Sequence, residues 1–406
     1  MTPGEESSDW IEQFLDYTDG INSPEIFRLW AGIVSVAGLL ERRVWSEIMG
    51  SQLYANLYAL LVSNPGVGKT QAILRTSKVW MGTKQLHVAA NSVSRASLVD
   101  AVAKAQRIII KNGIPLDYHS LQVASWEFGT LVPSYDLDFL NHLNELYDCG
   151  PYFREEKRMF KNNPIDISNP QLNMIAGTQP AYLSSLLPDE AWGMGFMTRV
   201  IMVYSGEMAR RPKLFSNGED RKVADPKLLA GLVAKGVSLL GEMGKAEWSS
   251  TAQLAYQTWV DAGMPPCPEH PRLEAYNTRR LIHVGKLAMI SAASAGHPLA
   301  IELEDFNRAL AWLIEAEVTM PDVFRAMVGK SDMVILRELY QYVWEAYSKG
   351  KKPIHNSRLV AFLSARVTSD KIDRIIQVAA KSGLIENGTY PDDWKPVPRA
   401  SGTLEN

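Results

Sequence analysis

The sequence lacks the features that mark secreted, membrane-bound or metal-binding proteins. Its 406 residues include only two cysteines, Cys149 and Cys267, which are far apart and have no partners at metal-ligand spacing. No apolar run approaches the roughly 20 residues of a membrane-spanning helix, and the seven histidines show no HExxH arrangement. Residues 1–9 are acidic and polar, unlike a signal peptide. We therefore expect a cytoplasmic globular protein with reduced cysteines and no membrane contact.

An excess of charge of one sign is also missing. The chain has 42 Lys and Arg against 45 Asp and Glu, a net charge of −3 at pH 7. This balance argues against a protein that binds polyanions over its whole surface, so any contact with nucleic acid must be local. A hydrophobic content of 46% over 406 residues is enough for about two or three domains with their own cores.

One motif stands out against this background, because residues 63–70 read SNPGVGKT. It follows the apolar run Leu57–Val62 and precedes an expected helix over Gln71–Trp80. In a phosphate-binding loop, backbone N–H groups freed by glycines surround the β-phosphate, the lysine reaches the β- and γ-phosphates, and the next hydroxyl ligates Mg²⁺. The sequence thus predicts a site for ATP and Mg²⁺, with Thr70 as metal ligand. The residues expected to contact the nucleotide are Asn64, Pro65, Gly66, Val67, Gly68, Lys69, Thr70 and Gln71.

The surrounding pattern predicts an α/β fold. Short β-like runs alternate with helical segments between residues 56 and 205, which is typical of a parallel sheet. These runs are Leu57–Ser63, Gln85–Ala90, Leu121–Ser125, Leu172–Gly177 and Val200–Tyr204. The expected domains are an N-terminal helical collar (1–55, helical over Asp9–Met49), the ATPase core (56–205), a linker (206–226), an all-helical lid (227–328), a winged-helix-like domain (329–390) and a flexible tail (391–406).

A P-loop ATPase needs a carboxylate at the end of a neighbouring strand to activate the attacking water. The run Leu121–Ser125 is followed by Trp126 and Glu127, so we predict Glu127 as the catalytic base. Trp126 occupies the place of the acidic residue that usually helps to hold the Mg²⁺ water shell, and Ser125 is a weaker candidate for that task through water. A solvated carboxylate at a strand end is the alternative interpretation of Glu127.

Two later segments add candidates. Asn173–Pro180 is an expected strand that ends in small and amide residues, and Gln179 is the candidate to sense the γ-phosphate or position water. Arg199 precedes another apolar strand. A cation there is either an ordinary surface residue or an arginine finger that reaches the γ-phosphate of a neighbouring subunit.

The order of these motifs resembles the AAA+ helicases encoded by phages and prophages, which are related to the MCM helicases and to poxvirus-type primase-helicases. The resemblance covers roughly residues 56–323. The blocks that carry it are Asn64–Thr70, Trp126–Phe128, Ala176–Pro180, Met197–Arg199, and Thr278–Leu281 with Lys286–Ala288. Ser63, in place of the first glycine, and Trp126 depart from the family pattern.

This resemblance implies an AAA+-like P-loop fold and a homo-oligomeric, hexameric ring. In the family the third block carries a sensor amide, the fourth a trans arginine finger, and the fifth a lid helix whose arginine contacts the phosphates. By similarity these roles fall on Gln179, Arg199 and Arg279, with Arg280 a close rival.

A basic tip is expected over Lys157–Asn163, between two extended stretches within residues 152–169. In the resembling helicases a hairpin at this place points into the central pore and grips the DNA backbone. Cations neutralise phosphates and an aromatic ring stacks on bases. The candidates are Lys157, Arg158, Phe160 and Lys161. Glu155 and Glu156 lie beside them, so a solvated hairpin with ordinary charges stays an open alternative.

The C-terminal part contains three helix-like segments, Ile335–Tyr347, Asn356–Leu363 and Ser369–Ser382, and is similar to a winged-helix module. Lys371 and Arg374 on the last helix are candidates for DNA contact. Winged helices also dock proteins, and the sequence leaves that use open.

Together these features predict an ATP-driven, ring-forming motor that translocates on single-stranded DNA: a replicative helicase of a phage or mobile element, acting in the bacterial host cytoplasm with primase or other replication proteins as candidate partners. Two alternatives belong to other classes. One is a helicase loader or AAA+ protein-remodelling ATPase, and the other is a nucleotide-dependent scaffold that hardly hydrolyses ATP.

Overall fold

The computed structural model divides into two compact units, Met1–Phe324 and Arg325–Asn406, each described here by itself. The structure describes residues 9–90, 95–111, 113–132, 136–155, 165–187, 192, 195–207, 225–328, 331–364, 367, 369–388, 390 and 392–398.

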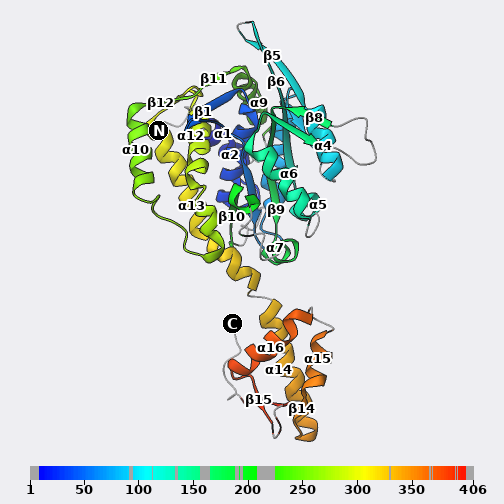
Figure 1. Ribbon diagram of the computed structural model, residues 1–406. Coiled ribbons are helices and arrows are strands. Elements are labelled where there is room, and N and C mark those ends of the chain that lie inside the picture. The colour runs from blue at the N-terminus through cyan, green and yellow to red at the C-terminus, as the bar shows by residue number, and fades with distance from the viewer. Residues whose placement is uncertain are drawn as a thin grey trace, which may run out of the picture. The chain divides into compact units, whose positions relative to one another are not determined.

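The first unit is built around a six-stranded sheet (Figure 1). Its strand order is β10–β3–β9–β6–β4, and β5 pairs with β6 beside this path. The strands are β3 (Tyr58–Val62), β4 (His87–Val88), β5 (Gln106–Lys111), β6 (Ile114–Ser125), β9 (Pro170–Thr178) and β10 (Val200–Tyr204). All neighbours pair in parallel except β5 and β6, which form an antiparallel hairpin. The predicted α/β class with a central parallel sheet is confirmed.

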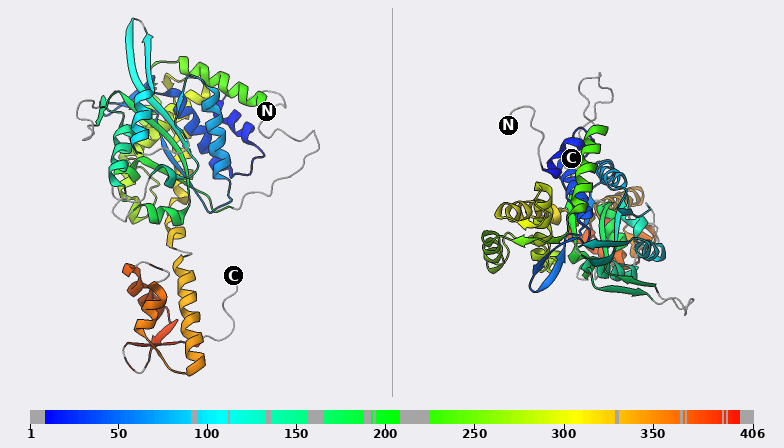
Figure 2. Two further views of the ribbon diagram at one scale, coloured as in Figure 1. Left: turned by 90° about the vertical axis from the view of Figure 1, so that its right-hand side faces the viewer. Right: turned by 90° about the horizontal axis from the view of Figure 1, so that it is seen from above.

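Helices cover both faces of this sheet (Figure 2). One face packs against α2 (Glu25–Leu40) and α3 (Lys69–Gly82), and the other packs against α5 (Phe128–Leu131) and α6 (Leu137–Asp148). Every residue of β3 and β9 is buried. Burial on both faces is why β3 is a continuous apolar run in the sequence. In β9 the polar Gln171 and Asn173 are buried as well, and their side-chain amides donate to the carbonyls of Glu41 and Val34.

Three further helices and a hairpin complete the core of this unit. They are α4 (Arg95–Lys104), α7 (Pro180–Leu186), α8 (Gly195–Arg199) and the antiparallel pair β7 (Tyr152–Glu155) and β8 (Ile165–Ser168). The hairpin stem lies where two extended stretches were predicted, between β6 and β9 in the chain.

The N-terminal segment differs in part from its prediction. Helices α1 (Trp10–Thr18) and α2 pack together as expected. The helical prediction is wrong for Val44–Ile48, which forms β1 between β2 (Ser51–Tyr54) and β11 (Gly244–Lys245). The strand β11 comes from a distant part of the sequence, so the pattern of residues around β1 does not predict this pairing.

The lid region is mainly helical and contains short strands. Two of these, β12 (Glu247–Trp248) and β13 (Ala300–Ile301), pair in parallel, so the expectation of an all-helical lid is wrong in this detail. Its helices are α9 (Pro226–Gly241), α10 (Ser250–Asp261), the short turns η2 (Pro271–Leu273) and α11 (Glu274–Asn277), α12 (Arg280–Ala295) and α13 (Leu303–Val328).

The second unit has its own core and sheet. The elements follow one another as α14 (Ser331–Gly350), β14 (Ile354–His355), α15 (Asn356–Ser364), α16 (Ser369–Lys381), β15 (Ile385–Asn387) and β16 (Asp393–Pro396). The three strands form an antiparallel sheet in the order β14–β16–β15. Leu339, Leu359 and Leu363 are fully buried in its hydrophobic core.

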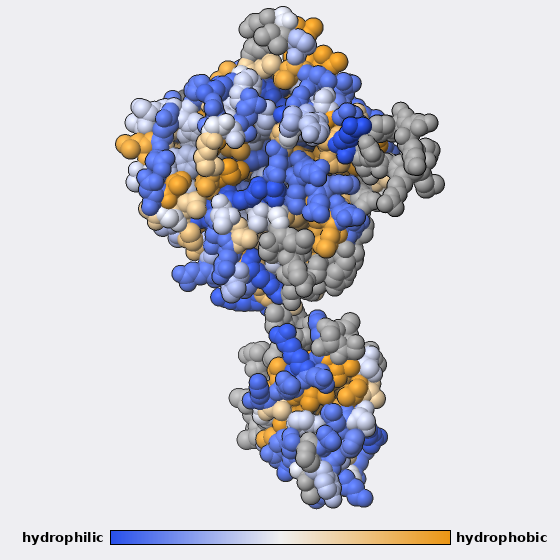
Figure 3. All heavy atoms as spheres, viewed as in Figure 1, coloured by the Kyte–Doolittle hydropathy of each residue, from blue (hydrophilic) through white to orange (hydrophobic). Residues whose placement is uncertain are grey.

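Hydrophobic side chains are scattered over the face of the first unit drawn in Figure 3. The β5–β6 hairpin is an exception, because Ile108 and Ile110 on β5 are 66% and 72% exposed. None of the helices in the described parts of the chain is both long and apolar enough to cross a membrane.

Candidate functional site

Three of the predicted blocks meet at one edge of the sheet. Strands β3, β9 and β6 are parallel neighbours, so their carboxyl ends lie together at what we call the carboxyl edge. The phosphate-loop sequence follows β3, Glu127 follows β6 and Gln179 follows β9. Val62 pairs with Thr178, and the N–H of Ser63 donates to the carbonyl of Thr178 at 3.3 Å. In sheets of this kind ligands bind at the carboxyl ends of the strands.

The loop over residues 63–68 has the backbone geometry of an anion cradle. Gly66 and Gly68 have φ of +84° and +99°, a region that costs residues with a side chain about 1–2 kcal/mol. Gly68 is the N-cap of α3, so the free N–H groups of its first turn face the loop. Thr70 is exposed in that first turn and its hydroxyl is accessible to a ligand.

Val67 is only 7% exposed and anchors the loop to the unit. Asn64, Pro65, Gly66 and Gln71 are exposed around it. Among the residues predicted to contact a nucleotide, these four and Thr70 therefore form an open rim, while Val67 and Lys69 are buried.

Lys69 lies inside this loop and is 6% exposed. Its ammonium donates to the Ser63 carbonyl at 2.8 Å, the Ser63 hydroxyl at 2.9 Å and the Asn64 carbonyl at 3.1 Å. Burial lowers the pKa of Lys69, and the negative charge of Glu127 acts in the opposite direction. The two residues follow strands whose carboxyl ends lie at the same edge of the sheet. A phosphate oxygen is an acceptor of the same kind as those that the ammonium already contacts.

The turn after β6 is fixed by hydroxyl groups. Ser125 and Thr130 donate to the carbonyl of Glu127 at 2.9 and 2.8 Å. Ser125, the candidate for holding metal-bound water, is 1% exposed and uses its hydroxyl in this turn. Trp126 is 43% exposed beside it.

The end of β9 contains a residue that sequence reasoning missed. Thr178 is fully buried next to the loop, and its hydroxyl has no hydrogen-bond partner among the described residues. An unpaired buried polar atom is unusual and requires an explanation. Gln179 follows as the N-cap of α7, with its backbone carbonyl accepting from the N–H groups of Tyr182 and Leu183. The pair Thr178 and Gln179 places a hydroxyl and an amide at the carboxyl edge.

Arg199 and Arg279 lie at the opposite edge, which we call the amino edge. Arg199 directly precedes β10, whose first residue Val200 pairs with Tyr58 at the start of β3. The five residues of β3 at about 3.3 Å each separate the two edges by roughly 15 Å. An arginine side chain cannot span this distance, so neither residue can reach a phosphate group held by the loop of its own chain.

One carboxylate brings the two arginines together. Asp148, at the end of α6, accepts from Arg199 Nε at 2.9 Å and from the other arm of the same guanidinium. It also accepts from Arg279 at 3.2 Å. Burial raises the pKa of Asp148, but the hydrogen bonds and charges of both arginines outweigh it and hold that pKa below its usual value.

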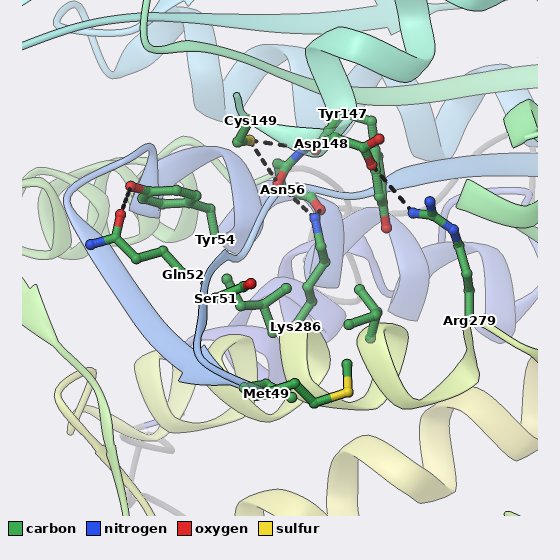
Figure 4. A pocket seen from close by; sticks show the side chains of 13 residues that line it. Met49, Ser51, Gln52, Tyr54, Asn56, Tyr147, Asp148, Cys149, Arg279 and Lys286 are labelled. Carbon is green, nitrogen blue, oxygen red and sulfur yellow. Dashed lines mark hydrogen bonds and ion pairs between the residues drawn. The ribbon is translucent and has the colours of Figure 1, made fainter. Parts of the chain in front are cut away.

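A cavity of about 400 Å³ opens beside this cluster (Figure 4). Arg279 and Asp148 line it together with Asn56, Tyr147 and Lys286. The Lys286 ammonium donates to the backbone and side-chain oxygens of Asn56 at 2.9 and 2.7 Å and lies 3.9 Å from the Tyr147 ring centroid. Burial lowers the pKa of Lys286 to about 8. On the polar side of the cavity, Lys286 is therefore buried and fully hydrogen-bonded. Arg279 is the more exposed of the two cations.

Arg280, the rival of Arg279, points into the unit. It is fully buried and its guanidinium pairs with Glu317 at 2.8 and 2.6 Å. His283, one turn further along α12, donates from Nε2 to the Thr198 carbonyl at 3.0 Å, and burial lowers its pKa to about 3. The Arg280–Glu317 pair joins α12 to α13, and the His283 contact holds α12 against α8, next to Arg199.

The nucleic-acid candidates are placed only in part. Lys157, Arg158, Phe160 and Lys161 lie outside the described residues, beyond the stem β7–β8. Lys371 and Arg374 are exposed on α16, where Asp373 lies between them. Within the described residues, no group of three or more His, Cys, Asp or Glu could hold a metal ion.

Comparisons of this chain with protein-family profiles and with curated proteins found no match.

Proposed function

We propose that the protein is an AAA+-like P-loop ATPase that assembles as a ring and translocates on single-stranded DNA. The observation that carries the proposal is the meeting of Lys69 and Glu127 at the carboxyl edge. There a glycine-rich loop with two left-handed residues opens onto the N-terminus of a 14-residue helix. A loop lysine and a carboxylate from the next-but-one strand supply what phosphoryl transfer to water requires.

Each residue at this edge has a chemical task in the proposal. The N–H groups of the first turn of α3 and the ammonium of Lys69 hold the phosphates of ATP, and the Thr70 hydroxyl holds Mg²⁺. The carboxylate of Glu127 accepts the proton of the attacking water. Thr178 and Gln179 lie where a hydroxyl and an amide orient that water. The open rim at Asn64–Gly66 and the exposed Thr70 fit these ligands.

Assembly into a ring is supported by the position of the arginine pair. Arg199 and Arg279 lie at the amino edge, out of reach of their own loop. Hydrolysis by P-loop ATPases is accelerated by about 10³–10⁵-fold when an arginine from outside reaches the transferring phosphate. The proposed ring is head-to-tail, with the amino edge of one copy facing the carboxyl edge of the next, so that each site is completed by its neighbour.

Single-stranded DNA as the substrate is supported by two features. The hairpin β7–β8 emerges between the strands that carry Glu127 and Gln179, and its tip sequence holds Lys157, Arg158 and Lys161. The second unit has the element order of a winged helix, with Lys371 and Arg374 exposed on α16. A replicative role with primase, in a phage or mobile element, rests on the resemblance of motifs.

A protein-remodelling or loader ATPase is the second candidate. It is favoured by the β5–β6 hairpin, whose Ile108 and Ile110 are 66% and 72% exposed. An exposed apolar strand suits contact with a protein client better than contact with DNA. A scaffold with slow turnover is favoured by Trp126, which occupies the position where an acidic residue usually helps to hold the water shell of Mg²⁺.

The test of nucleotide chemistry uses Lys69→Ala and Glu127→Gln, with Lys78→Ala as control. Lys78 is exposed on the same helix. We expect Lys69→Ala to lose ATP binding and turnover. Glu127→Gln should bind ATP with nearly unchanged affinity and lose about 10²–10⁴-fold in turnover, because only the proton transfer is removed. Wild-type turnover in Glu127→Gln with normal affinity would show that Glu127 is not the base.

A further inference from the structure

Asp148 occupies the centre of the arginine cluster at the amino edge. It is the last residue of α6, whereas Arg199 ends α8 and Arg279 is the N-cap of α12. One carboxylate oxygen accepts from both Arg199 Nε at 2.9 Å and Arg279 at 3.2 Å. Three separate elements are therefore joined through a single side chain, which lies in the lining of the cavity in Figure 4.

The two arginines use their donors differently. Arg199 is 9% exposed, and all three of its nitrogens are engaged: two on Asp148 and the third on the Gly195 carbonyl at 2.6 Å. Arg279 is 31% exposed and is bonded through one nitrogen, with no second hydrogen-bond partner among the described residues. Arg279 thus keeps two nitrogens and the greater exposure for an acceptor outside the chain, whereas every nitrogen of Arg199 is already engaged and its side chain is nearly buried.

The charge of Asp148 reduces the repulsion between the two arginines. Two guanidinium groups this close repel each other, and one carboxylate between them leaves the cluster with a single net positive charge. Arg279 also begins a 16-residue helix, whose N-terminus favours an incoming anion. The cluster is therefore arranged to present one oriented cation to an anionic group.

We propose that Asp148 is the positioning residue of this pair, holding Arg279 toward the terminal phosphate of ATP bound to a second copy of the chain while Arg199 serves as its buried anchor. This inference rests on the proposed function and gives the two arginines different roles. Arg279 contacts the phosphate, and Arg199 acts through Asp148.

The experiment separates the two halves of one composite site. Acceptor chains carry Arg199→Ala and Arg279→Ala and keep an intact phosphate loop. Donor chains carry Lys69→Ala and supply only the amino edge. ATP hydrolysis is measured as donor is added to a fixed amount of acceptor. The donors compared are Lys69→Ala alone, with Asp148→Asn, and with Glu145→Gln, an exposed carboxylate on the same helix.

We expect the plain donor and the Glu145→Gln donor to restore hydrolysis equally. The Asp148→Asn donor should restore at least tenfold less kcat, because a misplacement of about 1 Å costs up to ~10²-fold. The KM for ATP should not change, since the acceptor's loop is unaltered. A fall in kcat at constant KM separates positioning from general damage to the acceptor site.

Folding of the donor is checked by its thermal unfolding temperature. If Asp148→Asn lowers that temperature strongly, Asp148→Glu carries the test. It keeps the charge and moves the carboxylate by one methylene, so we expect a folded donor with reduced kcat. A folded Asp148→Asn or Asp148→Glu donor that restores as much hydrolysis as the plain donor, or more, overturns the role of Asp148 alone. Failure of the plain donor at every mixing ratio overturns shared sites, and the role of Asp148 falls with them.

Discussion

Gly68→Ala tests whether the segment between α1 and α2 closes against the phosphate loop. A Cβ built on Gly68 would lie 1.8 Å from the Asn22 carbonyl oxygen and 2.8 Å from the Ser23 Cα. All of these contacts are backbone atoms, which cannot rotate away as a side chain does. The left-handed φ of +99° adds conformational strain to the steric overlap.

Gly66→Ala is the matched control, because it has a similar φ of +84° and no heavy atom within 4 Å of the built Cβ. The strain common to both variants is about 1–2 kcal/mol. Overpacking adds about 1–3 kcal/mol to Gly68→Ala alone. We therefore expect Gly68→Ala to lose about 2–5 kcal/mol of unfolding free energy, and Gly66→Ala only about 1–2 kcal/mol.

The assay is urea unfolding of the full chain without nucleotide, followed by tryptophan fluorescence, with both variants compared with the unaltered chain. Trp80 on α3 is fully buried and reports on this region. ATP affinity is measured in parallel, and it should fall in Gly68→Ala because the loop must shift. Equal destabilisation of the two variants would refute the packing of residues 19–24 on the loop.

Two further predictions concern pH and DNA. The pKa of buried His283 is lowered to about 3, so between pH 6.5 and 3 the unfolded chain binds a proton that the folded chain does not. As the pH falls through that window, the free energy of unfolding should decrease by about 1.4 kcal/mol per pH unit. His283→Gln should remove this dependence when unfolding is measured at pH 7 and pH 5. An unchanged slope in that variant would contradict the prediction. Replacing Lys157, Arg158 and Lys161 with Ala should abolish stimulation of the ATPase by single-stranded DNA, leave basal hydrolysis, and reduce the salt slope of binding by about 2. Normal stimulation of the triple variant by DNA would show that these three residues are not needed for DNA contact.

Strands β3 and β10 could be predicted because a strand that is buried on both faces is a continuous run of apolar residues. Val200–Tyr204 was expected as a strand and is β10, and Leu57–Val62 contains β3. Val44–Ile48 was not predictable, because its strand pairing depends on Gly244–Lys245, far along the chain. The run expected over Gln85–Ala90 shrinks to His87–Val88, where β4 forms the end of the sheet path.

The candidate site divides in the same way. The proposed phosphate loop could be predicted because its motif lies in eight consecutive residues. Asp148 carries no local signal, since its partners Arg199 and Arg279 are 51 and 131 positions away. Thr178 was missed because a threonine in a strand points to a site only when its burial beside the loop is known.

We propose that the protein is an ATPase ring that works on single-stranded DNA. The most direct test of this proposal is the rate of ATP hydrolysis with and without single-stranded DNA, measured together with particle mass with and without ATP. We expect DNA to raise the rate strongly and the active particle to contain several copies of the chain. A particle that stays monomeric with ATP, and a rate that DNA leaves unchanged, would contradict the account.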